Sequence, residues 1–134
     1  MQTFTFIPAA SYCGVIFHAE QPFFPPSAGW AYWTPTDTDI RRAEMRLGAY
    51  LLVNASPLAK KLIRYNRQYV GVFRDGRRVI YINCFREDSK ARWWMDRDWW
   101  TKPVVVDDGG DRYFQVWYDV ESCEFSDLHI NGEA

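Results

Sequence analysis

The chain has few residues of the types that cross-link small proteins through disulfides or bind metal ions. Its 134 residues include only three cysteines and two histidines. The cysteines Cys13, Cys84 and Cys123 are odd in number and lack CxxC spacing, so neither a disulfide framework nor a zinc site is predicted. At this length a single domain can bury a hydrophobic core without disulfides or a structural metal ion. We therefore expect no metal and no cofactor.

Long apolar runs and an excess of charge of one sign are also missing. No stretch is apolar enough to span a membrane, and the first residues lack the basic and apolar segments of a secretory signal. We expect a cytoplasmic protein without membrane contact. The formal net charge is −1, so no basic field would attract a phosphate backbone, and nucleic-acid binding is not expected.

Known catalytic motifs are absent, including the GxSxG, HExxH, P-loop and GxGxxG patterns. The groups that could move a proton or attack a substrate are His18, His129, Cys84 and Asp127, beside the two other cysteines. Asp127 lies two residues from His129 and would share its strand face. Because the two histidines are far apart in the chain, we assign no catalytic residue, and an enzyme is the less favoured alternative.

Aromatic residues are abundant: they make up 18% of the chain, and seven are tryptophans. Segment 92–100 is the richest in tryptophan and also contains arginine, and both residue types are enriched in protein-binding hot spots. We predict that it binds a partner protein together with the adjoining turn at 107–111. The alternative is that its rings cap an open end of a sheet and are buried. The predicted contact residues are Arg92, Trp93, Trp94, Arg97, Trp99, Trp100 and Asp108.

The stretch 65–85 predicts two antiparallel strands joined by a tight turn. Asp75 and Gly76 tolerate the positive φ angles of a type I′ turn, and alternating apolar residues flank them. Over 79–85 both faces of the strand are largely apolar, which predicts an interior position in the sheet. Asn83 interrupts one face, and we interpret it as a structural amide with hydrogen-bond partners.

Two helices are expected before this hairpin. Thr34 can cap a helix, Pro35 suits its first position and Asp37 lies in its first turn, so we expect a helix over about 35–53. A second, short helix is predicted over 56–65. The first helix has one apolar stripe to bury, formed by Ile40, Ala43, Leu47, Tyr50 and Leu51.

Further strands are expected on both sides of the helices, and a proline-rich arm separates the first two from the first helix. A helix with one apolar stripe against an antiparallel meander predicts an α+β two-layer domain with a curved sheet of four to five strands. The additional predicted strands cover 3–7, 14–18, 102–107, 112–120 and 126–130. The single domain would comprise N-terminal strands and arm (1–33), helices (34–65) and sheet (66–134).

The run Asp107–Asp111 contains three carboxylates and two glycines. Clustered carboxylates can ligate hard cations, but the spacing of a calcium loop is absent. A Gly-Gly hairpin turn with solvated aspartates accounts for the run, and this is our interpretation.

Five short motifs lie in the C-terminal half: Y-x-R-Q-Y-V-G, I-Y-x-N-x-F, D-G-G, Y-D and N-G. This combination resembles a group of uncharacterised bacterial proteins, which are similar to cystatin-like folds, a helix wrapped by a curved antiparallel sheet. The resemblance implies that fold. It implies no established activity and transfers no catalytic residue, and it does not extend to the proline-rich arm or to segment 92–100.

Two further hypotheses remain open. A curved sheet and a helix can enclose a cavity for a small molecule or substrate, which Tyr81, Asn83, Tyr118 and His129 would line. A sheet that is apolar on both faces must also cover its second face, either with the N-terminal arm or with a second copy of the chain. The possible partners are therefore another protein or a homodimer.

Overall fold

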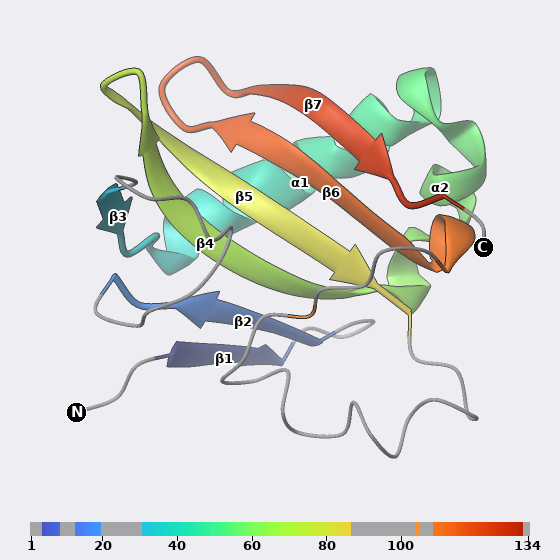
Figure 1. The fold of residues 1–134 in the computed structure, drawn as a ribbon, viewed down its shortest axis with the longest axis horizontal. Helices are drawn as coiled ribbons and strands as arrows, with labels where there is room; N and C mark the ends of the chain where they lie inside the picture. Colours follow the sequence, from blue (N-terminus) through green and yellow to red (C-terminus); the bar gives the residue numbers. More distant parts are fainter. Residues whose placement is uncertain (1–3, 9–12, 20–30, 87–103, 105–108, 133–134) are drawn as a thin grey trace.

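The computed structural model describes residues 4–8, 13–19, 31–86, 104 and 109–132. These residues form an α+β domain in which two helices lie against one face of a seven-stranded sheet (Figure 1). The helices are α1 (Asp37–Asn54) and α2 (Ser56–Lys61), and the short 3-10 helices are η1 (Leu62–Arg64) and η3 (Gly110–Arg112). The strands are β1 (Phe4–Pro8), β2 (Cys13–Phe17), β3 (Ala31–Trp33), β4 (Asn66–Arg74), β5 (Arg77–Phe85), β6 (Tyr113–Asp119) and β7 (Glu124–Ile130).

The sheet is mixed, and within the described residues its path runs β1-β2-β4-β5-β6-β7. β2 pairs in parallel with the first half of β4, and β3 pairs in antiparallel with the second half. The expectation of four to five antiparallel strands, with the helix at the N-terminus, was therefore wrong. Three strands precede α1 and join the sheet, whereas the strand predicted over 102–107 lies outside the described residues, apart from Val104.

Helix α1 begins two residues later than expected because a better cap is present. The Thr36 hydroxyl accepts from the Asp39 amide at 3.2 Å, and the Asp39 carboxylate accepts from the Thr36 amide at 3.0 Å. This reciprocal capping box satisfies two backbone donors at the helix start. Thr34, the predicted cap, instead accepts from the backbone amide of Ala19 at 2.8 Å.

The predicted hairpin is confirmed. Strands β4 and β5 pair over their full length, and the turn residues Asp75 and Gly76 have φ angles of 52° and 75°. Two successive left-handed residues are what a type I′ turn requires. β5 lies between β4 and β6, so its predicted interior position is also confirmed.

The space between the helices and the sheet is filled by buried side chains. The core stripe of α1 is as predicted, except that Tyr50 is only half-buried at its border. β5 contributes one face of its side chains and β6 contributes three more residues. None of the buried residues in this core is more than 3% exposed; they include Ile40, Ala43, Leu47, Leu51, Ile80, Ile82, Cys84, Phe114, Val116 and Tyr118.

The opposite face of the sheet carries a second apolar cluster. No member of this cluster is more than 8% exposed, so the face is covered within one chain. The argument for a homodimer from an uncovered sheet face therefore loses its basis. The buried members are Val15, Phe17, Val70, Val72, Val79, Phe85 and Tyr113.

Strand β3 lies very close to β4 at Gly71. Trp33 is opposite Gly71 in the register, and its carbonyl and ring leave no room for a Cβ there. The indole Nε1 of Trp33 donates to the carbonyls of Val72 and Val79, at 3.2 Å in each case. The glycine of the Y-x-R-Q-Y-V-G motif is thus required by packing.

Candidate functional site

The predicted protein-binding segment cannot be placed. Segment 92–100 and Asp108 lie outside the described residues. The contact that we expect there stays a prediction from the sequence.

The four residues of the predicted cavity are not brought together. Tyr81 and Asn83 lie on the face of β5 that is turned away from the helices, whereas Tyr118 on β6 belongs to the core beneath α1. His129 on β7 is exposed. Because buried side chains fill the space between the sheet and the helices, these four residues line no common cavity.

Asn83 belongs to a row of side-chain amides across the sheet face opposite the helices. Its Nδ2 donates to Gln68 Oε1 at 3.0 Å and to the Val104 carbonyl at 2.8 Å. Gln68 Oε1 also accepts from the Val104 amide at 2.9 Å, and Gln115 Nε2 donates to both Asn83 and Asn131 at 3.3 Å. The buried Asn83 amide is thus well partnered, which supports its interpretation as a structural residue.

The catalytic candidates are not assembled either. Cys84 is fully buried, and burial raises the pKa of its thiol, so the reactive thiolate is disfavoured. Asp127 has a φ of 53° at an irregularity in the β6–β7 pairing, and its carboxylate pairs with Arg74 at 3.0 Å. The irregularity interrupts the alternation that would have placed Asp127 and His129 on one face. Among the described residues, no three His, Cys, Asp or Glu side chains group as a metal site requires.

A buried ion pair joins α1 to β4. Arg67 is 2% exposed, and its Nε and Nη2 donate to the two carboxylate oxygens of Glu44, each at 3.2 Å. The Tyr69 hydroxyl donates to the same carboxylate at 2.7 Å. Burial alone would lower the pKa of Arg67, but Glu44 and neighbouring groups outweigh it and the pKa is raised. This network holds α1 in one orientation on the sheet.

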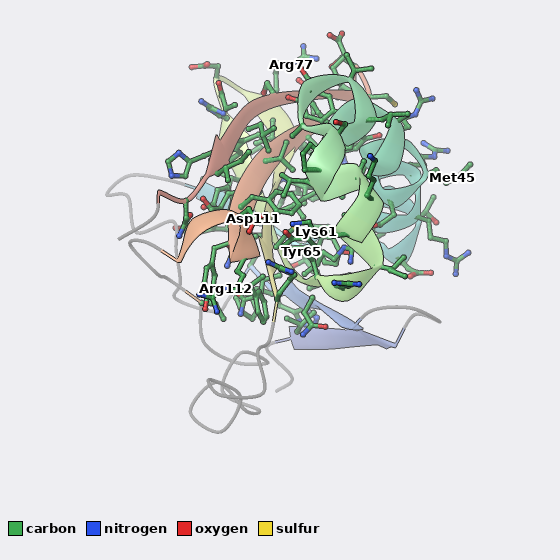
Figure 2. All side chains as sticks on the ribbon, turned by 90° about the vertical axis from the view of Figure 1, so that its right-hand side faces the viewer. Met45, Lys61, Tyr65, Arg77, Asp111 and Arg112 are labelled. Carbon is green, nitrogen blue, oxygen red and sulfur yellow. The ribbon has the colours of Figure 1, made fainter. Side chains whose placement is uncertain are left out.

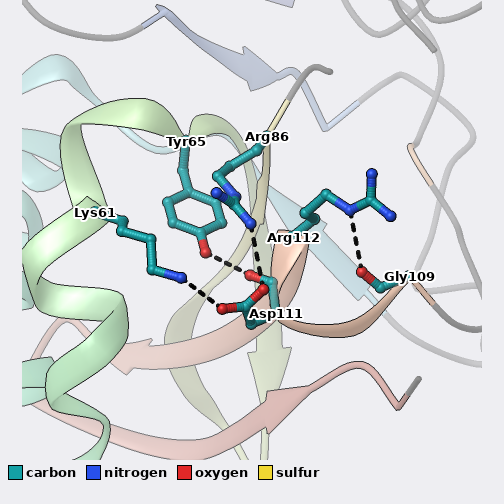
Figure 3. Close-up of polar contacts among 6 residues, drawn as sticks. All are labelled: Lys61, Tyr65, Arg86, Gly109, Asp111 and Arg112. Atoms are coloured by element: carbon teal, nitrogen blue, oxygen red, sulfur yellow. Dashed lines mark hydrogen bonds and ion pairs between the residues drawn. The ribbon is translucent and has the colours of Figure 1, made fainter. Parts of the chain in front are cut away.

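A second polar cluster joins α2, the end of β5 and η3 (Figure 3). The Asp111 carboxylate accepts from Lys61 Nζ at 2.7 Å and from Arg86 Nη2 at 3.2 Å, and the Asp111 carbonyl accepts from the Tyr65 hydroxyl. The hydrogen bond from Lys61 is the main cause that lowers the pKa of Asp111. Both cations share one carboxylate that they tie to the fold, so we interpret this cluster as structural.

The motifs that support the family resemblance have structural roles. Asp119 of Y-D accepts from Arg77 at 2.6 Å and from two backbone amides of the following turn at 2.9 and 3.1 Å. Gly110 of D-G-G donates its amide to the carbonyl of Gly132 of N-G at 3.1 Å. These motifs therefore specify the fold, and no site residue follows from them.

The side of α1 that points away from the sheet carries exposed apolar side chains. Met45, Leu52 and Val53 are 83%, 61% and 84% exposed, and the exposed Ala49 lies among them. Figure 2 shows Met45 projecting away from the body of the protein. Their i, i+4, i+7 and i+8 spacing places these four residues on one side of the helix, which we term the outer face of α1.

Two arginines border the outer face of α1. Arg42 and Arg46 are about one turn apart on the helix. Neither has an ion-pair or hydrogen-bond partner in the part of the chain that the structure describes, whereas Arg41 is paired with Asp37. Arg42, Arg46, Met45 and Cys123 of the β6–β7 turn line a hollow of about 330 Å³. Unpaired positive charge and apolar surface thus meet at one place.

Tyr118 on β6 lies close to Cys123, one of the residues that line this hollow. Tyr118 is 1% exposed, and its hydroxyl is buried without a hydrogen-bond partner among the described residues. Burial and the interaction with Cys123 together raise the pKa of Tyr118 to about 12, although the charges of Arg46 and Arg42 lower it. The Cys123 thiol is directed to the Val120 carbonyl, with 3.8 Å between sulfur and oxygen.

This site was not predicted from the sequence. Only the apolar stripe that α1 buries was predicted, and neither the arginines on the other side of the helix nor Met45, Leu52 and Val53 were expected to bind a partner. The signal that could have found them is a second apolar stripe at helical spacing, opposite the core stripe. The hollow itself has no local signal, because Cys123 reaches α1 only through the fold.

Comparisons with known proteins add no assignment. No protein-family model, no curated protein and no solved structure matches the chain. The resemblance to uncharacterised bacterial proteins and to cystatin-like folds therefore stays a prediction. In the described ranges, no helix is both long and apolar enough to cross a membrane.

Proposed function

We propose that the protein is a small binding module that holds a partner protein on the outer face of α1. The observation that supports this most strongly is the stripe of Met45, Leu52 and Val53 beside two arginines that have no partner among the described residues. Single exposed apolar residues are common on protein surfaces, but an apolar stripe on one helix side is typical of helix docking. Methionine and arginine are also enriched at protein interfaces.

Helix α1 is suited to act as a rigid platform. Its opposite side is fully buried at Ile40, Ala43, Leu47 and Leu51, and its flank is tied to β4 through Glu44. A partner would therefore meet a helix that is already ordered. Preorganisation of this kind lowers the entropy that binding must overcome.

The positive charge beside the outer face of α1 supports a partner that is negatively charged. Arg42 and Arg46 offer two positive charges, whereas that of Arg41 is balanced by Asp37. A complementary partner has apolar side chains at helical spacing, flanked by Glu or Asp. We therefore propose an acidic amphipathic segment as the occupant, and we expect salt to weaken its binding.

The tryptophan-rich segment 92–100 remains a second predicted contact site of the same functional class. Its Trp and Arg content supports protein binding for the reasons given above. The proposal for α1 does not depend on it. The cytoplasmic location expected from the sequence likewise stays a prediction.

Selection from a display library of randomised peptides on the full-length protein tests the proposal without knowledge of the partner. We expect the selected sequences to be acidic and to repeat apolar residues at steps of three and four. Synthetic copies should bind the wild type in fluorescence anisotropy titrations. Their affinity should fall by roughly tenfold or more for the variant Arg42→Glu/Arg46→Glu, because repulsion replaces attraction.

The matched control reverses the same amount of charge elsewhere. Lys60 and Arg64 are exposed on α2 and η1, outside the outer face of α1. The variant Lys60→Glu/Arg64→Glu should therefore bind the selected peptides almost as the wild type does. Selection of neutral or basic sequences, or an equal loss of affinity in both variants, would contradict the proposal.

A further inference from the structure

We propose that the hollow beside Met45 receives the phosphoryl group of a phosphorylated side chain in the partner. The inference rests on the proposed function, because the hollow borders the outer face of α1, and it adds the chemistry of the recognised group. The donors are the guanidinium groups of Arg42 and Arg46. Met45 and Cys123 form the apolar part of the wall.

The charge of the two guanidinium groups matches that of a phosphomonoester. Such a group carries about −1.5 to −2 at neutral pH, whereas an Asp or Glu side chain carries a single negative charge. No carboxylate among the described residues is paired with Arg42 or Arg46, so both charges are available. The planar guanidinium can also donate two parallel hydrogen bonds to phosphate oxygens.

The size of the hollow supports the same ligand class. A volume of about 330 Å³ lies near the lower end of the range for ligand pockets, roughly 300–1,000 Å³. A carboxylate alone would leave most of this volume unfilled. A phosphoryl group with the side chain that carries it fills more of it, and Met45 and Cys123 can contact the carbon atoms of that side chain.

The test compares phenyl phosphate with benzoate, which present a phosphoryl group and a carboxylate on the same ring. Isothermal titration of the full-length protein should show about tenfold tighter binding of phenyl phosphate. The variant Arg42→Gln/Arg46→Gln should lose this preference. The control Arg64→Gln, which removes an exposed charge outside the hollow, should keep it. Equal affinity for both probes, or no effect of the arginine variant, would overturn the inference.

The two proposals can fail separately. If acidic peptides lose affinity for the arginine variant while phenyl phosphate does not bind the wild type, the docking surface is supported and the phosphoryl site is overturned. If phenyl phosphate binds through Arg42 and Arg46 but no acidic amphipathic peptide is selected, the docking surface is contradicted. The assignment of the phosphoryl group to a partner protein then falls with it.

Discussion

Glu44 and Met45 are consecutive residues of α1 that face different surroundings: Arg67 holds the Glu44 carboxylate against the sheet, while the Met45 side chain is 83% exposed. The connection to the sheet and the centre of the proposed docking surface thus lie in one helical turn. Because the helix cannot rotate without breaking the buried pair, the sheet determines which side chains α1 presents to solvent. Stability and binding are therefore linked through this turn.

Loss of the buried carboxylate should destabilise the protein. Glu44→Ala leaves Arg67 buried without its counter-charge and should lower the free energy of unfolding by about 3 kcal/mol. Urea denaturation measures this change. The control Glu124→Ala removes an exposed carboxylate of β7 and should change it by less than about 0.5 kcal/mol. Equally small effects in both variants would show that the pair contributes little.

Asp119 should make stability depend on pH at the acid end. The hydrogen bond from Arg77, aided by two backbone amides, lowers the pKa of Asp119 from 3.8 to about 2. Because the folded pKa lies below the unfolded one, the stabilisation is present above about pH 4 and is lost as the pH falls toward 2. The pair is partly exposed, so the loss should be on the order of 1 kcal/mol.

Thermal unfolding across this pH window tests the prediction for Asp119. Asp119→Asn cannot ionise and should flatten the acid limb of the stability curve relative to the wild type. The control variant is Asp75→Asn. It changes an exposed turn residue with a φ of 52°, which asparagine also tolerates, and it should leave the fall in stability at acid pH unchanged. An acid limb as steep in Asp119→Asn as in the wild type would rule out this contribution.

Removal of the Tyr118 hydroxyl should stabilise the free protein. Tyr118→Phe removes a buried donor without a partner and should raise the free energy of unfolding by about 1 kcal/mol. Tyr65→Phe is the opposite case, because the Tyr65 hydroxyl donates to the Asp111 carbonyl, and its removal should lower stability by about 1 kcal/mol. Both are measured by chemical denaturation. A loss of stability in Tyr118→Phe would mean that its hydroxyl has a partner in solution.

The amide row should be sensitive to loss of one member. Gln68→Met keeps the approximate shape of the side chain but removes the oxygen that accepts from Asn83 and from the Val104 amide. The buried Asn83 amide and the partly buried Val104 amide then lose a partner, and the free energy of unfolding should fall by about 2 kcal/mol. Hydrogen exchange of the Val104 amide provides a local measurement. Protection of this amide as strong as in the wild type would argue against the contact.

The parts of the fold that depend on nearby residues were predictable. Asp75 and Gly76 specify their turn because few residues adopt two successive positive φ angles. The buried stripe of α1 was predictable because its apolar side chains recur at steps of three and four residues. The helix start was misplaced because Thr34 and Thr36 are both possible caps, and the choice depends on Asp39 three residues after Thr36.

The parts that depend on distant residues were not predictable. The parallel pairing of β2 with β4 joins segments about fifty residues apart, and their composition does not specify which edge of β4 is free. The proposed site has the same origin. Cys123 meets Arg42 and Arg46 only because the β6–β7 turn lies beside α1.

The most direct test of the docking surface is a charge exchange between α1 and a selected acidic peptide, measured by fluorescence anisotropy. If the partner docks on the outer face of α1, the variant Arg42→Glu/Arg46→Glu should lose affinity for the acidic peptide and gain affinity for a copy in which lysines replace the acidic residues. The wild type should show the reverse preference. Added salt should weaken both the binding of the acidic peptide to the wild type and the binding of the lysine copy to the variant. If wild type and variant bind the acidic peptide alike and neither prefers the lysine copy, the outer face of α1 is not where the partner docks.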